Sequence, residues 1–305
     1  MKNILIIGGS TPLQKLLPSF FNNEKINIVA VFLNPKEDQS ALKFCQRNSI
    51  EFFSYSEIHE QLKKLSDSNI DWLFNINSTI ILSDEILKIP SNGALNLHPG
   101  PLPTYAGLHT HQWAIRNNEI EFGVTLHWME EGIDTGDIAF QKTFPLTGNE
   151  TGLSLFMKCL NEGVNLVKVA LDYIVEEKDI PSIKQDLSKR QLYSNKMAMD
   201  GTINWNMGYN DLHNFFRAAD YKPFESPSYK PYTILNGKKL FIEKIQQSND
   251  TNKLEPGSIK LTKDHAIMIG LKDINVIVTP NLSKSDFNNM QDLIDFILQV
   301  LNKVQ

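Results

Sequence analysis

The stretch ALNLHPGPLPTYAG, residues 94–107, contains the passage from strand to loop on which the fold assignment rests. Side chains alternate across a strand, so the two leucines face one side while Asn96 and His98 face the other. Pro99 cannot continue the hydrogen bonding of a central strand, which places His98 at a carboxyl end. Ligands of open α/β sheets bind at that end. We therefore expect Asn96 and His98 at a ligand-binding edge, although this segment alone also fits a solvated polar strand end.

Upstream and downstream of this stretch, compact apolar runs alternate with segments of helical periodicity. Such alternation predicts a Rossmann-like α/β fold with a doubly wound, mainly parallel sheet. The expected strands are 3–7, 26–33, 51–55, 72–76, 94–98 and 123–129, and the expected helices are 12–21, 40–48, 58–65 and 150–175.

The composition changes after about residue 180, where short strand candidates and turns replace the alternating pattern. Asn236-Gly237 lies between two apolar runs, which is a strong hairpin signal. Many short strands with turns predict a smaller β-barrel of the OB-like class. We therefore expect a first domain over residues 1–205 and a second over 206–305. The expected elements of the second are helices 212–219 and 290–304 and strands 232–235, 239–245, 258–261, 266–270 and 275–279.

Composition and charge limit the possible partners. The 305 residues carry a net charge of −5, whereas domains that hold nucleic acid by its phosphates usually have a basic surplus. The N-terminal apolar run, Ile4 to Ile7, is too short for a signal-peptide core or a membrane span. We expect a cytoplasmic protein without membrane contact. Its two cysteines, Cys45 and Cys159, are expected as buried thiols in a reducing compartment.

A second polar segment follows the strand predicted at 123–129. Gly132 and Gly136 allow the loop after that strand to bend sharply, and Asp134 lies between them. A carboxylate on such a loop can reach a histidine of a neighbouring strand, orient it and favour its charged form. Taken alone, Asp134 also fits a turn-capping aspartate.

Together these segments resemble the folate-dependent formyltransferase family, which includes methionyl-tRNA formyltransferase, glycinamide ribonucleotide transformylase and the sugar N-formyltransferases. The resemblance covers residues 1 to about 205, and a weaker likeness to the C-terminal barrel of longer members continues through 200–205 and 256–258. The motifs that carry it are Asn96-Leu97-His98-Pro99, Gly123-Val124-Thr125-Leu126-His127, Ile133-Asp134-Thr135-Gly136 and Gln141.

The resemblance implies a catalytic role for three of these residues. Asn96 would donate a hydrogen bond to the oxygen that becomes negative as an amine attacks the formyl carbon. His98 would polarise that oxygen or relay a proton, and Asp134 would orient His98 and hold a water that accepts the proton. The implied donor is N10-formyltetrahydrofolate. The matching residues of its apolar slot are Ile80, Ile81, Leu82, Glu131, Gly132, Ile133 and Asp137, although Ile80–Leu82 fits core packing equally well.

The acceptor is expected to meet the first glycine turn and the proline loop. Gly9, Ser10 and Thr11 stand where a phosphate can meet a helix N-terminus, but the full dinucleotide fingerprint is absent and a plain tight turn fits as well. The loop from Pro99 and Gly100 to Tyr105 is stiffened by prolines, as befits a pocket wall. His109 is expected to line the same pocket. A metal pair formed with His111 is a weak alternative, and we expect no metal.

Two departures from the tRNA-modifying members favour a small-molecule amine, above all a nucleotide-linked amino sugar. Residues 34–40 form a short loop with more acids than lysines where those members carry a basic one. Gly100-Pro101-Leu102-Pro103 with Tyr105-Ala106-Gly107 replaces their usual motif. Four alternatives stay open: methionyl-tRNA formylation, formylation of an amino-acid unit in peptide biosynthesis, hydrolysis of the formylated folate, and a relic that only binds. A homodimer is also compatible with the sequence.

Overall fold

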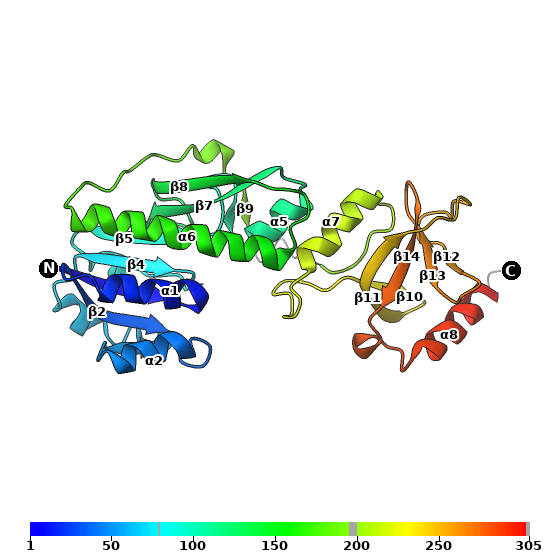
Figure 1. Cartoon of the computed structure of the whole chain (residues 1–305), viewed down its shortest axis with the longest axis horizontal. Coiled ribbons are helices and arrows are strands. Elements are labelled where there is room, and N and C mark those ends of the chain that lie inside the picture. The colour runs from blue at the N-terminus through cyan, green and yellow to red at the C-terminus, as the bar shows by residue number, and fades with distance from the viewer. Residues whose placement is uncertain (79, 195–199, 303–305) are drawn as a thin grey trace. The chain divides into compact units, whose positions relative to one another are not determined.

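The computed structural model describes residues 1–78, 80–194 and 200–302. The chain divides into two compact units (Figure 1). The first comprises residues 1–111, 121–146 and 155–195. The second comprises 112–120, 147–154 and 196–305, so it takes two short segments from the N-terminal half of the chain as well as the C-terminal third.

The first unit is built on a seven-stranded sheet of order β3-β2-β1-β4-β5-β7-β8. The first five strands in that order are parallel, and the hairpin of β7 and β8 adds two antiparallel strands beside β5. This confirms the Rossmann-like prediction. The strands are β1 (Lys2–Gly8), β2 (Ile26–Leu33), β3 (Phe52–Ser54), β4 (Trp72–Ile76), β5 (Gly93–His98), β7 (Glu121–Trp128) and β8 (Ile138–Pro145), and a separate pair joins β6 (Ala106–Gly107) to β9 (Leu192–Tyr193).

Alternation along the parallel strands fills two cores, one on each face of this sheet. In β1, Ile4 and Ile6 belong to one buried cluster while Leu5 and Ile7 belong to the other. A strand buried on both faces reads as a continuous apolar run, which is why β1 contains no polar residue between Ile4 and Ile7. The first face is covered by α1 (Ser10–Phe21), α2 (Gln39–Arg47) and α6 (Gly152–Val175) (Figure 1). The second face is covered by α3 (Leu62–Ser66) and α4 (Asp84–Leu87).

The helix expected over 58–65 forms only in its second half, and residues 58–61 are a turn. A 3₁₀ turn, η1 (Tyr55–Glu57), comes first, and α3 spans only five residues. Ser54 and Glu57 form a capping box that starts the turn before the expected helix. A second 3₁₀ turn, η2 (Leu187–Lys189), precedes β9.

The second unit contains a curled five-stranded antiparallel sheet of order β10-β11-β14-β13-β12, a half-barrel that confirms the predicted small β fold (Figure 1). Its core joins strand residues such as Leu240 and Val276 to Leu293 of the last helix. The elements are α7 (Tyr209–Ala219), β10 (Tyr232–Leu235), β11 (Lys238–Gln247), β12 (Ile259–Leu261), β13 (Ile267–Gly270), β14 (Asn275–Pro280), η3 (Leu282–Lys284) and α8 (Met290–Asn302), and α5 (Thr110–Arg116) begins at the junction of the two units. In the described part of the chain, no helix has the length and apolarity needed to cross a membrane.

Candidate active site

Three polar side chains lie side by side on neighbouring strands of the first unit. The register pairs Asn96 of β5 with Asn75 of β4 on one side and with His127 of β7 on the other. Partners in register on adjacent strands lie close enough for their side chains to interact. Because His98 is two residues beyond Asn96, it shares the same face of β5 at the strand's carboxyl end. The sheet thus forms a polar row at the edge where ligands of this fold class bind.

Asp134 reaches this row from the loop that follows β7. Its Oδ2 lies 3.4 Å from His98 Nδ1 and its Oδ1 lies 3.3 Å from His127 Nε2. The backbone N–H of Gly107 also donates to Oδ2 at 2.8 Å. The loop turns through left-handed backbone at Gly132, with φ +120°, and at Asp134 itself, with φ +54°. The structure therefore brings Asn96, His98 and Asp134 together and adds His127.

Two further side chains hold the Asp134 loop in place. The Gln185 side-chain amide donates to the carbonyl of Asp134 at 3.0 Å and to that of Gly136 at 2.6 Å. Arg190 donates to the carbonyl of Ile133 at 2.7 Å. The position of the carboxylate thus depends on residues far along the chain: Gln185 is 51 residues beyond Asp134, and Arg190 is 57 residues beyond Ile133.

Burial and charge act in opposite directions on this cluster. His98 is only 4% exposed, and burial lowers the pKa of its imidazole, with the Asp134 carboxylate and the Tyr105 carbonyl opposing the effect. Burial also opposes ionisation of Asp134, but His98, His127 and the Gly107 N–H together hold its carboxyl pKa well below the usual range. At neutral pH the site therefore contains a carboxylate beside a neutral His98.

The amide of Asn96 is oriented by hydrogen bonds on both of its sides. His127 Nδ1 lies 2.8 Å from the carbonyl of Trp128, which can only accept, so Nδ1 carries a proton and, in the neutral imidazole, Nε2 is an acceptor. Asn96 Nδ2 donates to that Nε2 at 2.9 Å, and its distance to Asp134 Oδ1 is 3.5 Å. Asn75 Nδ2 donates to Asn96 Oδ1 at 2.9 Å. The second hydrogen of the Asn96 amide is therefore only weakly engaged and is available to a ligand.

Neither His127 nor Asn75 was among the residues predicted for the site. The signal for His127 was the alternation in the predicted strand 123–129, where Thr125 and His127 share the face opposite the apolar residues. The signal for Asn75 was a lone amide in the apolar run WLFNI. Asn75 is 3% exposed, and its Oδ1 has no hydrogen-bond partner among the described residues. Such an unmet buried acceptor destabilises a fold by about 1–3 kcal/mol.

The proline loop forms the wall on the other side of His98. The His98 Nε2 donates to the carbonyl of Tyr105 at 2.6 Å, because that carbonyl can only accept. Thr125 fixes the loop by donating to the carbonyl of Gly100 at 2.7 Å and accepting from the Leu102 N–H at 3.1 Å. Gln141 donates to Thr125 and to the Leu102 carbonyl. Thr125 and Gln141, both in the quoted motifs, thus support the imidazole through the loop.

Gly100 has no room for a side chain, and we expect Gly100→Ala to disable the site while the protein still folds. A Cβ there would lie 2.5 Å from the Tyr105 carbonyl oxygen and 2.6 Å from His98 Nε2, so it would break the hydrogen bond between them. We expect turnover to fall by about 10²-fold, in keeping with misplacement of a catalytic group. Steady-state kinetics with a thermal melt checks this. Turnover within about threefold of the parent protein would show that this bond does not position His98.

The residues predicted for the folate slot have different environments. Ile81 is 80% exposed and Ile133 is 46% exposed, so both apolar side chains are accessible to a ligand. Leu82 is buried in the core of the sheet's second face, and Ile80 packs against that core. The remaining predicted residues lie on the Asp134 loop, where Glu131 and Gly132 are exposed and Asp137 accepts from Ser182 at 2.6 Å.

The glycine turn after β1 is bordered by oxygen atoms. A Cβ on Gly9 would lie 2.9 Å from Tyr55 Oη and 3.2 Å from the buried carboxylate of Asp38. Burial, followed by the charge of Asp38, raises the pKa of the Tyr55 hydroxyl. A carboxylate here repels phosphate, so this edge suits hydroxyl groups better. Thr11 is partly exposed, and the Ser10 side chain lies outside the described part of the structure.

The other residues predicted to line the acceptor pocket surround the proline loop. Tyr105 is buried and stacks on Tyr193 with ring centroids 5.2 Å apart. The Pro99 carbonyl accepts from Thr110 at 2.7 Å. His109 is partly exposed with φ +54°, and burial lowers its pKa. His111 is fully packed, and burial lowers its pKa to about 3. Across the described residues, no three His, Cys, Asp or Glu side chains are arranged to hold a metal.

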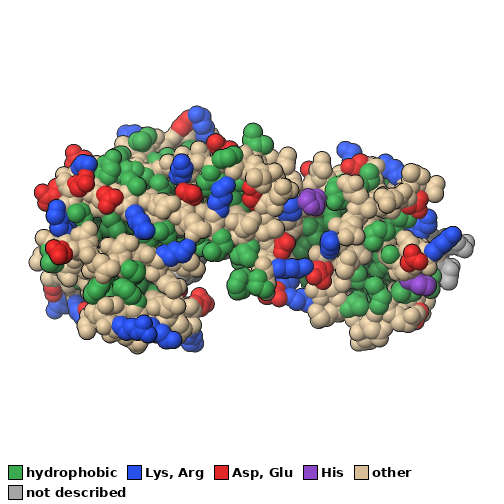
Figure 2. Space-filling model, in the orientation of Figure 1, with side chains coloured by type: hydrophobic (Ala, Val, Ile, Leu, Met, Phe, Trp, Pro, Cys, Tyr) green, Lys and Arg blue, Asp and Glu red, His purple; other side chains and the backbone are tan. Residues whose placement is uncertain are grey.

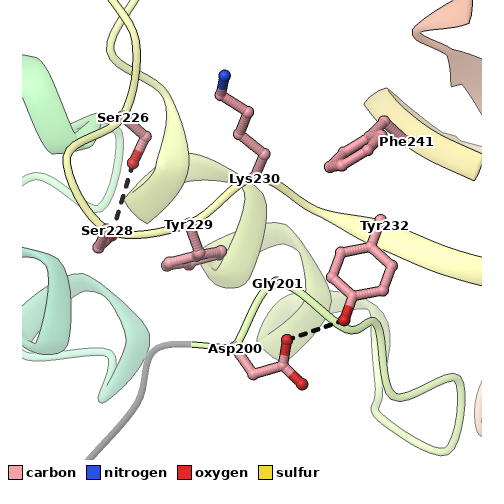
Figure 3. Close-up of a pocket in the computed structure, with 8 residues that line it drawn as sticks. All are labelled: Asp200, Gly201, Ser226, Ser228, Tyr229, Lys230, Tyr232 and Phe241. Atoms are coloured by element: carbon pink, nitrogen blue, oxygen red, sulfur yellow. Dashed lines mark hydrogen bonds between the residues drawn. The ribbon is translucent and has the colours of Figure 1, made fainter. Parts of the chain in front are cut away.

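A cavity of about 320 Å³ lies wholly within the second unit (Figure 3). Asp200, Lys230, Tyr232 and Phe241 are among the residues that line it, and the hydroxyl of Tyr232 donates to Asp200 (Figure 3). The Lys239 ammonium lies 3.7 Å from the centre of the Tyr232 ring and covers one face of it. None of the residues predicted for the site lines this cavity.

Comparison with known proteins agrees with this geometry. Residues 2–171 match the formyl transferase family, and residues 196–290 match the formyl transferase C-terminal domain. The chain is 31% identical over 219 residues to the methionyl-tRNA formyltransferase of Clostridium tetani, which is 71% of this chain and 67% of that protein. It is 28% identical over 292 residues to the enzyme of the same name from Malacoplasma penetrans, which is 91% of this chain and 88% of that protein.

Solved structures show the same fold. An N-formyltransferase from Helicobacter canadensis, in complex with folinic acid and dTDP-3-aminofucose, superposes with a TM-score of 0.68 at 24% identity over 92% of this chain and 100% of that one. WlaRD, a sugar 3N-formyltransferase, gives a TM-score of 0.66 at 24% identity over 92% and 98%. The family matches cover both units and include every element of the polar row, which confirms the family prediction. The chain belongs to the formyl transferase family and is a transferase enzyme.

Proposed function

We propose that this formyltransferase moves the formyl group of N10-formyltetrahydrofolate to a primary amine of a nucleotide-linked amino sugar. The observation that carries the reaction is the contact of Asp134 with two imidazoles beside an Asn96 amide whose second N–H is only weakly engaged. The exposed apolar side chains of Ile81 and Ile133 support a folate slot. Folinic acid in the Helicobacter relative and 5-N-formyl-tetrahydrofolate with WlaRD support the same class of donor.

The site suits an addition–elimination reaction. The amine nitrogen attacks the formyl carbon, and the carbonyl oxygen becomes negative in the tetrahedral intermediate. The second N–H of Asn96 donates to that oxygen. The amine proton passes to His98, whose Nδ1 is the unprotonated nitrogen and faces Asp134 Oδ2, so the new imidazolium is stabilised by the carboxylate. The carbon–N10 bond then breaks, and N10 takes the proton from the His98 imidazolium, so tetrahydrofolate leaves and His98 returns to its neutral form.

Several features support a small acceptor over tRNA. The net charge is −5, and Lys and Arg side chains are interspersed with Asp and Glu on the face seen in Figure 2, without one large basic field. The buried Asp38 carboxylate stands beside Gly9, in the acidic loop where a polyanion would meet repulsion. The relatives in complex with dTDP-3-aminofucose or dTDP support a nucleotide-linked sugar. The methionyl-tRNA formyltransferase relatives make charged tRNA the competing acceptor.

We expect the acid limb of the kcat profile to lie below the ordinary histidine pKa of about 6.5. Neutral His98 is the form that takes the proton, and burial lowers its pKa, so this form persists into more acidic solution. Activity should be fully present above that pKa and lost as the pH falls through it. Measuring kcat at saturating acceptor separates this limb from protonation of the free amine. A limb above about 6.5, or turnover that rises on acidification, would contradict the assignment.

A parallel assay of acceptors tests the proposal. The protein and N10-formyltetrahydrofolate are incubated with a panel of dTDP- and UDP-linked amino sugars, with free amino sugars, and with charged initiator tRNA. We expect formylation of one or more nucleotide-linked amino sugars and none of the tRNA. Formylation of the tRNA alone would establish the competing acceptor and overturn the proposal.

A further inference from the structure

We propose that Asn75 is a positioning residue that sets which end of the Asn96 amide faces the reacting formyl group. The inference rests on the formyl transfer proposed above, and no motif of the sequence includes Asn75. Its basis is the pair of hydrogen bonds that run from β4 through β5 to β7, all within the first unit.

The direction of these hydrogen bonds is determined from the β7 end. The Trp128 carbonyl requires a proton on His127 Nδ1, which leaves Nε2 able only to accept from its neighbours while His127 is neutral. The NH2 group of Asn96 must therefore point towards His127, at 2.9 Å, and its oxygen must point towards β4. Asn75 meets that oxygen with its own NH2 group at 2.9 Å. Donor and acceptor match at every step only in this orientation.

The environment of Asn75 shows that its side chain donates to Asn96 while its own oxygen stays without a hydrogen bond. It lies in an apolar strand whose residues are all buried, and its own exposure is 3%. Within the described chain, its Oδ1 has no hydrogen-bond partner, whereas its Nδ2 donates to Asn96 Oδ1. A leucine or valine would fill such a position without an unmet acceptor. The retained amide thus has one evident effect, the donation to Asn96 Oδ1.

The substitution Asn75→Asp reverses the arrangement. The ionised carboxylate of this variant can only accept, so it would attract the NH2 group of Asn96 and turn the Asn96 oxygen towards the site. That oxygen cannot stabilise the developing negative charge. In its protonated form the new carboxyl group can donate, and it would restore the native orientation. Because burial raises a carboxyl pKa, protonation is accessible near neutral pH.

The test compares the parent protein with Asn75→Asp and Asn75→Ala. At about pH 8 we expect Asn75→Asp to lower kcat by about 10²-fold, the loss seen when an oxyanion donor is removed. The ratio of its kcat to that of the parent should rise as the pH falls to about 6. Asn75→Ala should lower kcat about tenfold, with a ratio that does not depend on pH. The KM for the formyl donor should change less than about threefold in both.

The matched control is Asn27→Asp, since Asn27 is exposed and likewise donates its side-chain amide to an asparagine, Asn3. It should leave kcat and its pH dependence unchanged. The proposal would be overturned if the ratio of the Asn75→Asp kcat to the parent kcat did not depend on pH, or if Asn75→Ala kept full turnover. If one of the two variants fails to fold, the other still tests the proposal. The ¹⁵N–¹⁵N coupling across Asn96 Nδ2–H and His127 Nε2 provides a readout without turnover. Loss of this coupling in Asn75→Asp at about pH 8 would support the proposal, and its persistence would refute it. Because the coupling is measured without substrate, the result does not depend on which acceptor the enzyme uses.

Discussion

Asp134→Asn is expected to lower kcat for formyl transfer by about 10³-fold or more. Asp134 contacts both imidazoles of the site, at 3.4 Å and 3.3 Å. An asparagine would have no charge with which to stabilise the imidazolium of His98. Its NH2 group would also meet either the Gly107 N–H or the hydrogens of the Asn96 amide, donor against donor.

Steady-state kinetics and a folate-binding titration check this prediction together. We expect kcat to fall while the affinity for formylated folate stays within about threefold, since the lost interaction belongs to the transition state. Asp186→Asn is the control, because Asp186 is an exposed aspartate of the same unit that caps a 3₁₀ turn. Substantial turnover in Asp134→Asn, or an equal loss in the control, would remove the carboxylate from the reaction.

His98→Ala is expected to reduce kcat by about 10²–10⁴-fold, the usual contribution of a positioned acid or base. The imidazole is buried between the Tyr105 carbonyl and the Asp134 carboxylate, so alanine would leave no imidazole nitrogen at this position to take the amine proton. The acid limb of the kcat profile should disappear with it, because that limb reports the titration of His98.

His59→Ala provides the control for this substitution, since His59 is an exposed histidine of the same unit. Its kcat and pH profile should match those of the parent protein. For His98→Ala, both kcat and its pH profile must be measured, because the profile shows whether the acid limb belongs to His98. A slow variant that keeps the parent's acid limb would assign that limb to another group.

The fold was predictable because its strands are buried on both faces. Continuous apolar runs and their spacing identified β1, β2, β4 and β5 almost to the residue. The strand β8 was not predicted, since Gln141, Lys142 and Thr143 interrupt its apolar pattern and only pairing with β7 makes it a strand. The helix expected at 58–65 was wrong over its first half, because the local capping box of Ser54 and Glu57 starts a tighter turn before it.

The candidate site was predictable to the extent that it lies on one strand. Alternation along β5 was enough to place Asn96 and His98 on one face. Asp134 was connected to them only through the family resemblance, because its reach depends on the bend of a loop. His127 and Asn75 lie across strand pairings that no local pattern specifies. Gln185 and Arg190, which hold the Asp134 loop by its carbonyls, lie in a segment with no distinctive sequence at all.

The most direct test of the account is to follow a ¹³C label from the formyl group of N10-formyltetrahydrofolate in a reaction with a nucleotide-linked amino sugar. We expect the label to appear as a formamide on the sugar's amine nitrogen, in amounts equal to the tetrahydrofolate released, and both signals to be lost in Asp134→Asn. Labelled free formate that forms at the same rate with or without the amine would show that the site hydrolyses the donor, and would contradict the account.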